Sequence, residues 1–310
     1  MEIVLWIFLA IMFLFVLPTL VIAYVIYSVL LVRTDTEKWG RNPSMPDDEE
    51  YVRLYAQADE WGAAYAGYKK DVEVKSDGLR LVGEYFDFGG ENAVIILPGR
   101  MESCTYSYHY AEPYRRAGWN VLTIDARAHG RSEGKINSLG YKEYRDVIVW
   151  SKLLHDEFGI KRIVLHGVCI GSSTALFTAT AKECPDYVAG VIADGMYQRF
   201  YDSCRNHMLY DKRPIFPFLY EVMLHIRVFS GANVVTDGPK KRIVNMRRPI
   251  RFLHSREDLF STPDKAQELY ERCPSENKSI CWFDHGWHSR LRITDPDKYD
   301  GAVTDFLASL

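Results

Sequence analysis

Residues 162–176, with the sequence RIVLHGVCIGSSTAL, constrain the fold of this chain more than any other stretch. Apolar residues of strand character run up to Val168, and small residues with helix-compatible spacing follow Gly171. Glycines two residues on either side of Cys169 are typical of a sharp strand-to-helix turn, because a β-carbon at either position would collide with the neighbouring turn. The pattern therefore predicts a nucleophile elbow with Cys169 at its apex, where serine is usual.

Short apolar runs and helical patterns alternate over most of the chain. The expected strands cover residues 72–74, 81–86, 93–97, 120–124, 163–168, 188–193, 250–254 and 279–283. The expected helices cover 51–64, 107–117, 140–158, the residues after Cys169, and the stretch from about 296. Continuous apolar runs such as 93–97 are typical of strands buried on both faces. The alternation predicts an α/β fold with an open, mostly parallel sheet and helices on both faces, preceded by a hairpin at 72–86.

The beginning of the chain has a composition suited to a membrane. Residues 3–32 contain no charged side chain. A bilayer-spanning helix needs about 20 apolar residues, so this segment is long enough to cross with tilt. A cleaved signal peptide would instead have a basic start, an apolar core of about 7–15 residues and small residues at its cleavage site. Met1-Glu2 and the bulky residues before Arg33 do not fit that alternative, and we expect residues 1–33 to form an uncleaved transmembrane anchor.

Charges beside the anchor predict its orientation in the cell membrane. Arg33, Lys38 and Arg41 follow the apolar segment closely, and no lysine or arginine precedes it. Because a basic flank prefers the cytoplasm, we expect a single-pass protein whose remaining chain is cytoplasmic. Six cysteines without a CxxC pair fit free thiols in a reducing compartment. A net charge of −3 over 310 residues gives no indication of nucleic-acid binding.

Two stretches depart from the alternating pattern. Residues 34–70 are polar at first and then have the apolar face of a helix, so we expect a linker and an N-terminal helix before one domain at 71–310. Within that domain, residues 195–247 lack a clear strand and are rich in aromatic side chains. Insertions at this place lie over the carboxyl ends of the strands, where ligands bind in such sheets. We expect a helical cap that lines an apolar pocket; the alternative is an ordinary helical excursion whose aromatic side chains fill the core.

An acid and a base follow the last two expected strands. A catalytic nucleophile needs a base, and the base needs an orienting partner. The strand at 250–254 leads into Glu257 and Asp258, and the strand at 279–283 leads into His285 and His288. His288 fits the base better because Gly286 gives its loop room to turn the ring back, and Asp258 fits the orienting acid; His285 and Glu257 are the alternatives. The chain order of nucleophile, acid and base is the one known for α/β-hydrolases.

Two backbone N–H groups are candidates for an oxyanion hole. Such a hole takes one N–H from the residue after the nucleophile, here Ile170, and one from the loop after the strand at 93–97. That loop begins Pro98-Gly99-Arg100, and Arg100 is the expected second donor.

Other functional interpretations of the same residues have weaker support. His285 and His288 lack a third ligand at suitable spacing, so we expect no metal site. The glycines around Cys169 are better explained by the elbow than by a phosphate loop. Ser172 and Ser173 are alternative nucleophiles, but they fall on the following helix and point away from the apex.

Beyond the elbow, three further motifs carry a family resemblance. They are residues 125–132 (DARAHGRS), residues 248–254 (RPIRFLH) followed by Asp258, and Gly286-Trp287-His288. With these motifs the chain resembles single-domain bacterial α/β-hydrolases of the serine aminopeptidase-like or lysophospholipase-like type, over residues 70–310. The resemblance implies a cap after the sixth strand and cofactor-independent hydrolysis of an ester, thioester or amide. Carried over residue by residue, it implies Cys169 as nucleophile, Asp258 as acid and His288 as base, with a mainly structural role for 125–132.

The sequence departs from the family pattern at three places. Ala128 replaces the first glycine of the 125–132 motif, Pro98 replaces the usual histidine before the oxyanion loop, and Cys169 replaces the elbow serine. A thiol ionises more readily than a hydroxyl, and a helix N-terminus beside an imidazole favours the thiolate further. Dienelactone hydrolases are similar in having cysteine at this elbow.

Our sequence hypothesis is a membrane-anchored Cys–His–Asp hydrolase that forms a covalent acyl-enzyme. Its substrate is expected to be a small molecule, a lipid-like molecule or a peptide. The alternative is a protein with a degenerate site that binds a ligand or senses redox state through the thiol.

Overall fold

The computed structural model describes residues 1–310, apart from the side chains of Phe8 and Ile11. Eight strands form one sheet in the order β1-β2-β4-β3-β5-β6-β7-β8. The pairs β1–β2 and β2–β4 are antiparallel, and all other neighbours are parallel. The strands are β1 (Lys69–Ser76), β2 (Leu79–Phe86), β3 (Asn92–Leu97), β4 (Asn120–Ile124), β5 (Arg162–Val168), β6 (Val188–Asp194), β7 (Ile250–Ser255) and β8 (Lys278–Phe283). The predicted mostly parallel sheet is confirmed.

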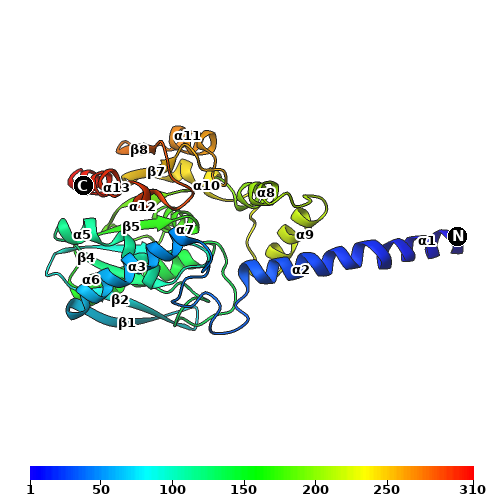
Figure 1. Ribbon diagram of the computed structural model, residues 1–310, viewed down its shortest axis with the longest axis horizontal. Helices are drawn as coiled ribbons and strands as arrows, with labels where there is room; N and C mark the ends of the chain where they lie inside the picture. The colour runs from blue at the N-terminus through cyan, green and yellow to red at the C-terminus, as the bar shows by residue number, and fades with distance from the viewer.

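Helices cover both faces of the sheet (Figure 1). Successive side chains of a strand point to opposite faces, so Ile95 packs on one side and Val94 on the other. On the Ile95 side lie α6 (Glu143–Phe158), α7 (Ile170–Ala179), α10 (Pro239–Arg242) and α11 (Pro263–Arg272). On the Val94 side lie α3 (Glu49–Ala64), α5 (Glu112–Arg116), α12 (Leu291–Thr294) and α13 (Pro296–Ala308).

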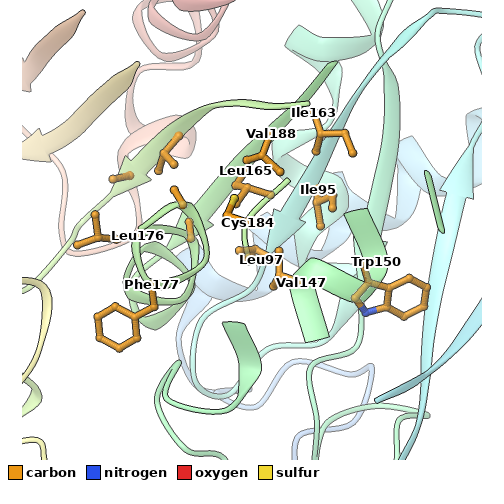
Figure 2. Packing of buried hydrophobic residues seen from close by; sticks show 14 of the residues in the cluster. Ile95, Leu97, Val147, Trp150, Ile163, Leu165, Leu176, Phe177, Cys184 and Val188 are labelled. Carbon is orange, nitrogen blue, oxygen red and sulfur yellow. The ribbon is translucent and has the colours of Figure 1, made fainter. Parts of the chain in front are cut away.

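Large apolar side chains fill the Ile95 side of the sheet (Figure 2). Trp150 of α6 and Leu176 of α7 are fully buried in the same apolar cluster as Ile163 and Leu165 of β5. Burying a side chain of this size stabilises the fold by about 1.5–3 kcal/mol. This packing holds β5 and α7 rigidly, and the elbow joins these two elements.

Two helix predictions differ from the structure. The single helix expected over 107–117 is wrong, because the chain forms α4 (Cys104–Ser107), a 3₁₀ turn over Tyr108–Tyr110, and then α5. Pro113 lies in the first turn of α5, where its missing N–H is tolerated, but its ring cannot continue a helix that arrives from earlier residues. Helix α11 is absent from the expected elements, although Thr262 and Pro263 mark its start.

The aromatic stretch after β6 is helical. It contains α8 (Phe200–Tyr210), α9 (Phe218–His225), a π-helical segment over Ile226–Ser230, and α10. Its aromatic side chains fall into two groups: some are buried, such as Tyr197 and Phe200, and others are exposed, such as Tyr220. The expectation of a cap that turns its aromatic residues inward therefore holds for only part of this segment.

A long apolar helix precedes the domain. It consists of α1 (Glu2–Ile11), a π-helical segment over Met12–Val16, and α2 (Leu17–Leu31), and it projects away from the sheet (Figure 1). By length and composition it could cross a membrane. Its last turns behave differently, because Ala23, Tyr27 and Leu31 are buried among side chains of α8, α9 and the elbow.

The residues after this helix bind to the domain. Arg33 donates to the carbonyl oxygens of Gly130 and Ser132, and Arg41 pairs with Glu84 and Asp125 at 2.6 and 3.0 Å. These contacts tie the end of the apolar helix to the sheet.

Candidate active site

Cys169 lies between β5 and α7 with backbone angles of φ 55° and ψ −112°. Residues with a side chain rarely adopt positive φ, so the turn holds Cys169 in a strained conformation. A β-carbon on Gly167 would lie 2.2 Å from the carbonyl carbon of Gly171, and one on Gly171 would lie 2.1 Å from the carbonyl oxygen of Leu97. Neither position has room for a larger residue. The backbone geometry matches the elbow expected from the glycine spacing.

Cys169 is more exposed than the hydroxyl groups of the nearby serines. Its side chain is partly exposed, and its backbone N–H donates to the carbonyl oxygen of Asp194 at 2.9 Å. The hydroxyl of Ser172 is buried and donates to the carbonyl oxygens of Gly167 and Asp194 at 2.6 and 2.8 Å. Ser173 is fully buried. The thiol alone therefore occupies the apex.

His288 lies in the loop after β8, and its ring faces the carboxylate of Asp258. Its Nδ1 is 2.6 Å from Oδ2 of Asp258, and its Nε2 is buried without a hydrogen-bond partner in the described part of the chain. Gly286 has φ 113°, which gives this loop its turn. A ring held through Nδ1 with Nε2 free has the orientation that a general base needs.

Charges around His288 favour its protonated form. Burial alone disfavours the imidazolium, but the Asp258 carboxylate and the negative charge of an ionised Cys169 outweigh this effect. The pKa of His288 therefore lies well above its ordinary value.

Asp258 is held by its own loop. Its Oδ1 accepts hydrogen bonds from the backbone N–H groups of Phe260 and Ser261, each at 2.8 Å, which leaves Oδ2 for His288. Burial alone would raise the pKa of this carboxyl. The charge and hydrogen bond of His288 lower it more, so the pKa of Asp258 lies below its ordinary value. Asp258 is therefore set to remain a carboxylate beside the ring.

The alternative acid and base bind each other at the surface. Nδ1 of His285 is 3.1 Å from Oε1 of Glu257, and the backbone N–H of Gly286 donates to Oε2 of Glu257 at 3.2 Å. Both side chains are exposed. The structure thus brings Asp258 and His288 together and sets Glu257 and His285 apart from them.

The two expected oxyanion donors lie at the start of α7 and after β3. Neither the Ile170 nor the Arg100 N–H donates a hydrogen bond within the described residues, so both are available to a ligand. The Arg100 carbonyl oxygen lies within hydrogen-bond distance of Nε2 of His129. The Arg100 side chain donates to the carbonyl oxygen of Leu30 in α2 at 3.2 Å. The loop with the second donor is therefore attached to both the 125–132 loop and the apolar helix.

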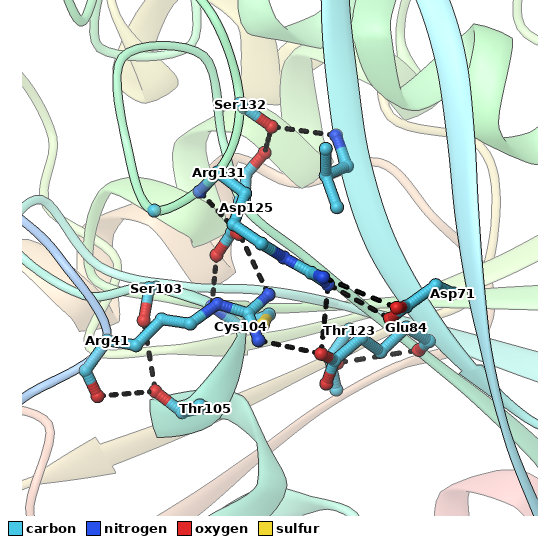
Figure 3. Close-up of polar contacts among 12 residues, drawn as sticks. Arg41, Asp71, Glu84, Ser103, Cys104, Thr105, Thr123, Asp125, Arg131 and Ser132 are labelled. Atoms are coloured by element: carbon cyan, nitrogen blue, oxygen red, sulfur yellow. Dashed lines mark hydrogen bonds and ion pairs between the residues drawn. The ribbon is translucent and has the colours of Figure 1, made fainter. Parts of the chain in front are cut away.

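A charged network fixes the 125–132 loop (Figure 3). The carboxylate of Asp125 accepts hydrogen bonds from the backbone N–H groups of Cys104 and Arg131 and from the guanidinium of Arg41. A β-carbon on Gly130 would lie 2.2 Å from the carboxyl carbon of Asp125, so the loop closes tightly on this side chain. Ala128, which replaces a glycine of the family motif, has φ 65°. These contacts indicate that the 125–132 loop has a structural role beside the site.

A second buried acid under the elbow was not singled out from the sequence. Asp194 ends β6, and the Tyr299 hydroxyl donates to its Oδ2 at 2.8 Å. Burial raises the pKa of Asp194 to about 7, although Tyr299 and His288 oppose this. Its position at the carboxyl end of a central strand is the signal that could have drawn attention to it. The following residue, Gly195, lies against the His288 ring, and a β-carbon there would be 3.0 Å from Cε1.

Cys169 is one of two thiols that are not fully buried. All six cysteines are free, and only Cys169 and Cys281 are partly exposed. Burial raises the pKa of Cys281. Among the described residues, no group of three or more His, Cys, Asp or Glu side chains could hold a metal ion.

Comparisons with known proteins agree on the fold. Residues 92–220 match the family model described as the α/β hydrolase fold. The Pyrococcus furiosus esterase Pf2001 is similar with a TM-score of 0.68 and 26% identity, over 80% of this chain and 93% of the esterase. Mouse alpha/beta hydrolase domain-containing protein 10 shares the fold with a TM-score of 0.57 and 16% identity, over 77% of this chain and 98% of that one. The fold implied by the sequence motifs is confirmed.

Two relatives match most of this chain at the level of sequence. The Bacillus subtilis protein YqkD is 27% identical over 221 residues, which are 71% of this chain and 72% of YqkD. A Saccharomyces cerevisiae protein named as membrane protein YNL320W is 27% identical over 245 residues, which are 77% of this chain and 79% of the yeast protein.

Proposed function

We propose that this chain, which has the α/β-hydrolase fold, is a membrane-anchored hydrolase that cleaves ester, thioester or amide bonds with Cys169, His288 and Asp258. The observation that carries the proposal is the orientation of His288. Its Nδ1 binds Asp258 at 2.6 Å, its Nε2 is free, and its pKa responds to the charge of Cys169 at the elbow apex. These are the relations that a nucleophile, a base and an orienting acid require.

In the proposed reaction the sulfur of Cys169 attacks the acyl carbonyl carbon. His288 holds the thiol proton as the carbon–sulfur bond forms, and it gives that proton to the leaving group as the scissile bond breaks. Water then attacks the acyl-enzyme with His288 taking its proton, the carbon–sulfur bond breaks as His288 returns that proton to the sulfur, and the carboxylic acid leaves. Asp258 keeps the ring oriented and stabilises the imidazolium.

The negative oxygen of each tetrahedral intermediate needs two donors. The backbone N–H groups of Ile170 and Arg100 are proposed for this role, because both are free and both flank the elbow. The positive end of α7 adds to the same stabilisation, since Ile170 begins this helix.

An apolar acyl substrate suits the surroundings of the thiol. Cys169 contacts a cluster of buried apolar side chains that includes Ile170, Tyr197, Phe200 and residues of α2 and α9. The likeness to an enzyme named as an esterase supports a carboxylic ester as the first substrate to try.

We further propose that the helix over Glu2–Leu31 spans the cell membrane with the catalytic domain in the cytoplasm. Basic residues follow the helix and none precedes it. The yeast relative named as a membrane protein supports membrane attachment. A reporter enzyme fused to the carboxyl terminus tests the orientation: a cytoplasm-specific reporter should be active, and activity of an export-specific reporter would overturn it.

Catalysis is tested with the full-length protein in detergent and a series of p-nitrophenyl esters and acyl thioesters of increasing chain length. We expect activity in wild type, none above background in Cys169→Ala, a large loss in His288→Ala, and wild-type activity in Cys281→Ala, the matched half-buried thiol. Iodoacetamide should block wild type and Cys281→Ala alike. A silent wild type whose Cys169 is alkylated no faster than Cys281 would overturn the proposal and favour a degenerate site.

A further inference from the structure

Helix α9 has a buried face and an exposed apolar face. Leu219, Val222 and Met223 are buried, and they belong to the same cluster as Cys169 and Ile170. The opposite side is defined here as the outer face of α9. It consists of Tyr220 and Leu224 of the helix, which are 54% and 53% exposed, with Phe216 just before the helix and Val228 in the π-helical segment after it, which are 79% and 64% exposed.

The outer face of α9 is too apolar to be an ordinary surface. Tyr220 and Leu224 lie four residues apart on one side of α9, and exposed Val228 follows in the π-helical segment that continues it. Between residues 214 and 230 the only charged side chains of the sequence are Glu221 and Arg227. Monomeric soluble proteins rarely expose contiguous apolar patches larger than a few hundred Å², and such patches mark contact with a protein or a membrane.

The apolar helix that begins the chain runs beside α9 (Figure 1). The Thr19 hydroxyl of α2 donates to Oε1 of Glu221 at 2.8 Å. The rings of Tyr24 and Tyr27 lie 5.6 and 5.5 Å from the ring of Phe229, which follows α9. The outer face of α9 therefore adjoins the exposed apolar surface of α2.

The length of the apolar helix places α9 relative to a bilayer. Thirty helical residues extend about 45 Å, whereas the hydrocarbon core is only about 30 Å thick. About 20 residues suffice to cross it, so the last ten lie at the level of the headgroups. These last turns carry Ala23, Tyr27 and Leu31, which the domain buries. The part of the helix beside α9 therefore straddles the edge of the hydrocarbon: Thr19, which binds Glu221, is near the end of the crossing stretch, and Tyr24 and Tyr27, which lie beside Phe229, belong to the emerging turns.

We propose that the outer face of α9 lies in the interface of the same bilayer, on the side of the domain, as a second membrane contact beside the anchor. Aromatic and aliphatic side chains on one face of a helix suit this depth, where tyrosine is enriched. The proposal rests on the proposed membrane anchor and is independent of catalysis by Cys169. It assigns the exposed aromatic residues of this segment to lipid, while the buried ones pack near the elbow.

Photo-crosslinking in phosphatidylcholine vesicles tests this contact. Full-length Cys169→Ala protein, which cannot hydrolyse an ester by the proposed route, carries p-benzoylphenylalanine in place of Tyr220 or, as a second position, Leu224. Tyr68 is the matched control, because it is a tyrosine of nearly the same exposure (51%) next to β1. Phe13 of the apolar helix, 69% exposed, is the control for the anchor itself. Lipid adducts are measured by mass spectrometry after irradiation.

We expect lipid adducts at positions 13, 220 and 224, each severalfold above the yield at 68. Adducts at 13 with yields at 220 and 224 no higher than at 68 would overturn the inference and leave the anchor standing. No adducts at 13 would contradict the anchor, and the inference would be lost with it.

Discussion

Two histidine–carboxylate pairs connect the loop after β7 with the loop after β8, and they differ in almost everything except their chemistry. Glu257 and His285 meet at 3.1 Å with side chains 53% and 81% exposed. Asp258 and His288 meet at 2.6 Å with side chains 1% and 11% exposed. The two carboxylates are adjacent in sequence and the two histidines are three residues apart. One pair nevertheless lies in water and the other in the interior beside the elbow.

The comparison teaches that location decides what such a pair can do. In water the attraction is weakened by the solvent and contributes little. In the interior the same groups shift each other's protonation, which raises the pKa of His288 and lowers that of Asp258 despite their burial. Only the inner pair has a ring whose free nitrogen is buried near Cys169. The proposed catalytic role follows from this environment.

The largest difference is expected between the two histidine variants. His288→Ala removes the proposed general base, a group that contributes about 10²–10⁴-fold to the rate, so kcat/KM should fall by such a factor. His285→Ala removes only a surface partner and should leave kcat/KM unchanged. Steady-state kinetics on the best ester measures both. Similar losses in the two variants would remove the distinction between the pairs.

A smaller difference is expected between the carboxylate variants. Asp258→Asn retains an oxygen for the N–H groups of Phe260 and Ser261 but loses the charge that holds the imidazolium. Loss of the orienting acid alone costs less than loss of the base, so we expect a smaller fall in kcat/KM than in His288→Ala. Glu257→Gln should have wild-type kinetics. If Glu257→Gln lost as much kcat/KM as Asp258→Asn, the assignment of Asp258 as the acid would be wrong.

Gly195→Ala perturbs the inner pair without changing its chemistry. Gly195 has φ 61°, and a β-carbon would lie 3.0 Å from Cε1 of His288. The backbone strain alone should lower the free energy of unfolding by about 1–2 kcal/mol, and the displaced ring should lower kcat as well. The control is Gly301→Ala in α13, where a β-carbon meets nothing within 4 Å and where we expect a gain of about 0.5–1 kcal/mol. Urea unfolding measures the stability of both variants, and steady-state kinetics measures kcat. An unchanged kcat in Gly195→Ala would place the His288 ring away from Gly195.

The smallest effect is expected in the pH dependence of stability. Because folding raises the pKa of His288, its contribution is fully present below the unfolded value of about 6.5 and is lost as the pH rises through the folded pKa. Asp258→Asn removes the main charge that raises this pKa, so its Tm should fall less steeply than that of wild type above about pH 6.5. Glu257→Gln should retain the wild-type slope. Equal slopes in all three proteins would contradict the coupling of His288 to Asp258.

The sheet could be predicted well because its signals are local. Each expected strand has a counterpart from β1 to β8, since short apolar runs between glycine, proline and charged residues leave little choice. The break before Pro113 shows the limit: the stretch 107–117, expected to be one helix, is divided by a proline whose effect depends on where the helix starts. The hairpin turn is also local, with Asp77 and Gly78 both at positive φ.

The site could be predicted only as a set of candidates. The sequence favours Asp258 over its neighbour Glu257, and what separates the two physically is the turn whose N–H groups bind Oδ1 of Asp258. The packing of α2 against α9 depends on contacts between residues about 200 positions apart, such as Thr19 with Glu221. No local pattern contains that information, and the same holds for the attachment of Arg100 to Leu30.

The measurement that tests the central claim most directly is a search for the acyl-enzyme. The wild-type protein is mixed with a p-nitrophenyl ester that it hydrolyses, quenched in acid within the first turnovers, digested and analysed by mass spectrometry. The account predicts an acyl group on the sulfur of Cys169, present in His285→Ala as in wild type, and absent from Cys169→Ala. Ester hydrolysis at the wild-type rate by Cys169→Ala, or an acyl group found on another residue, would contradict it.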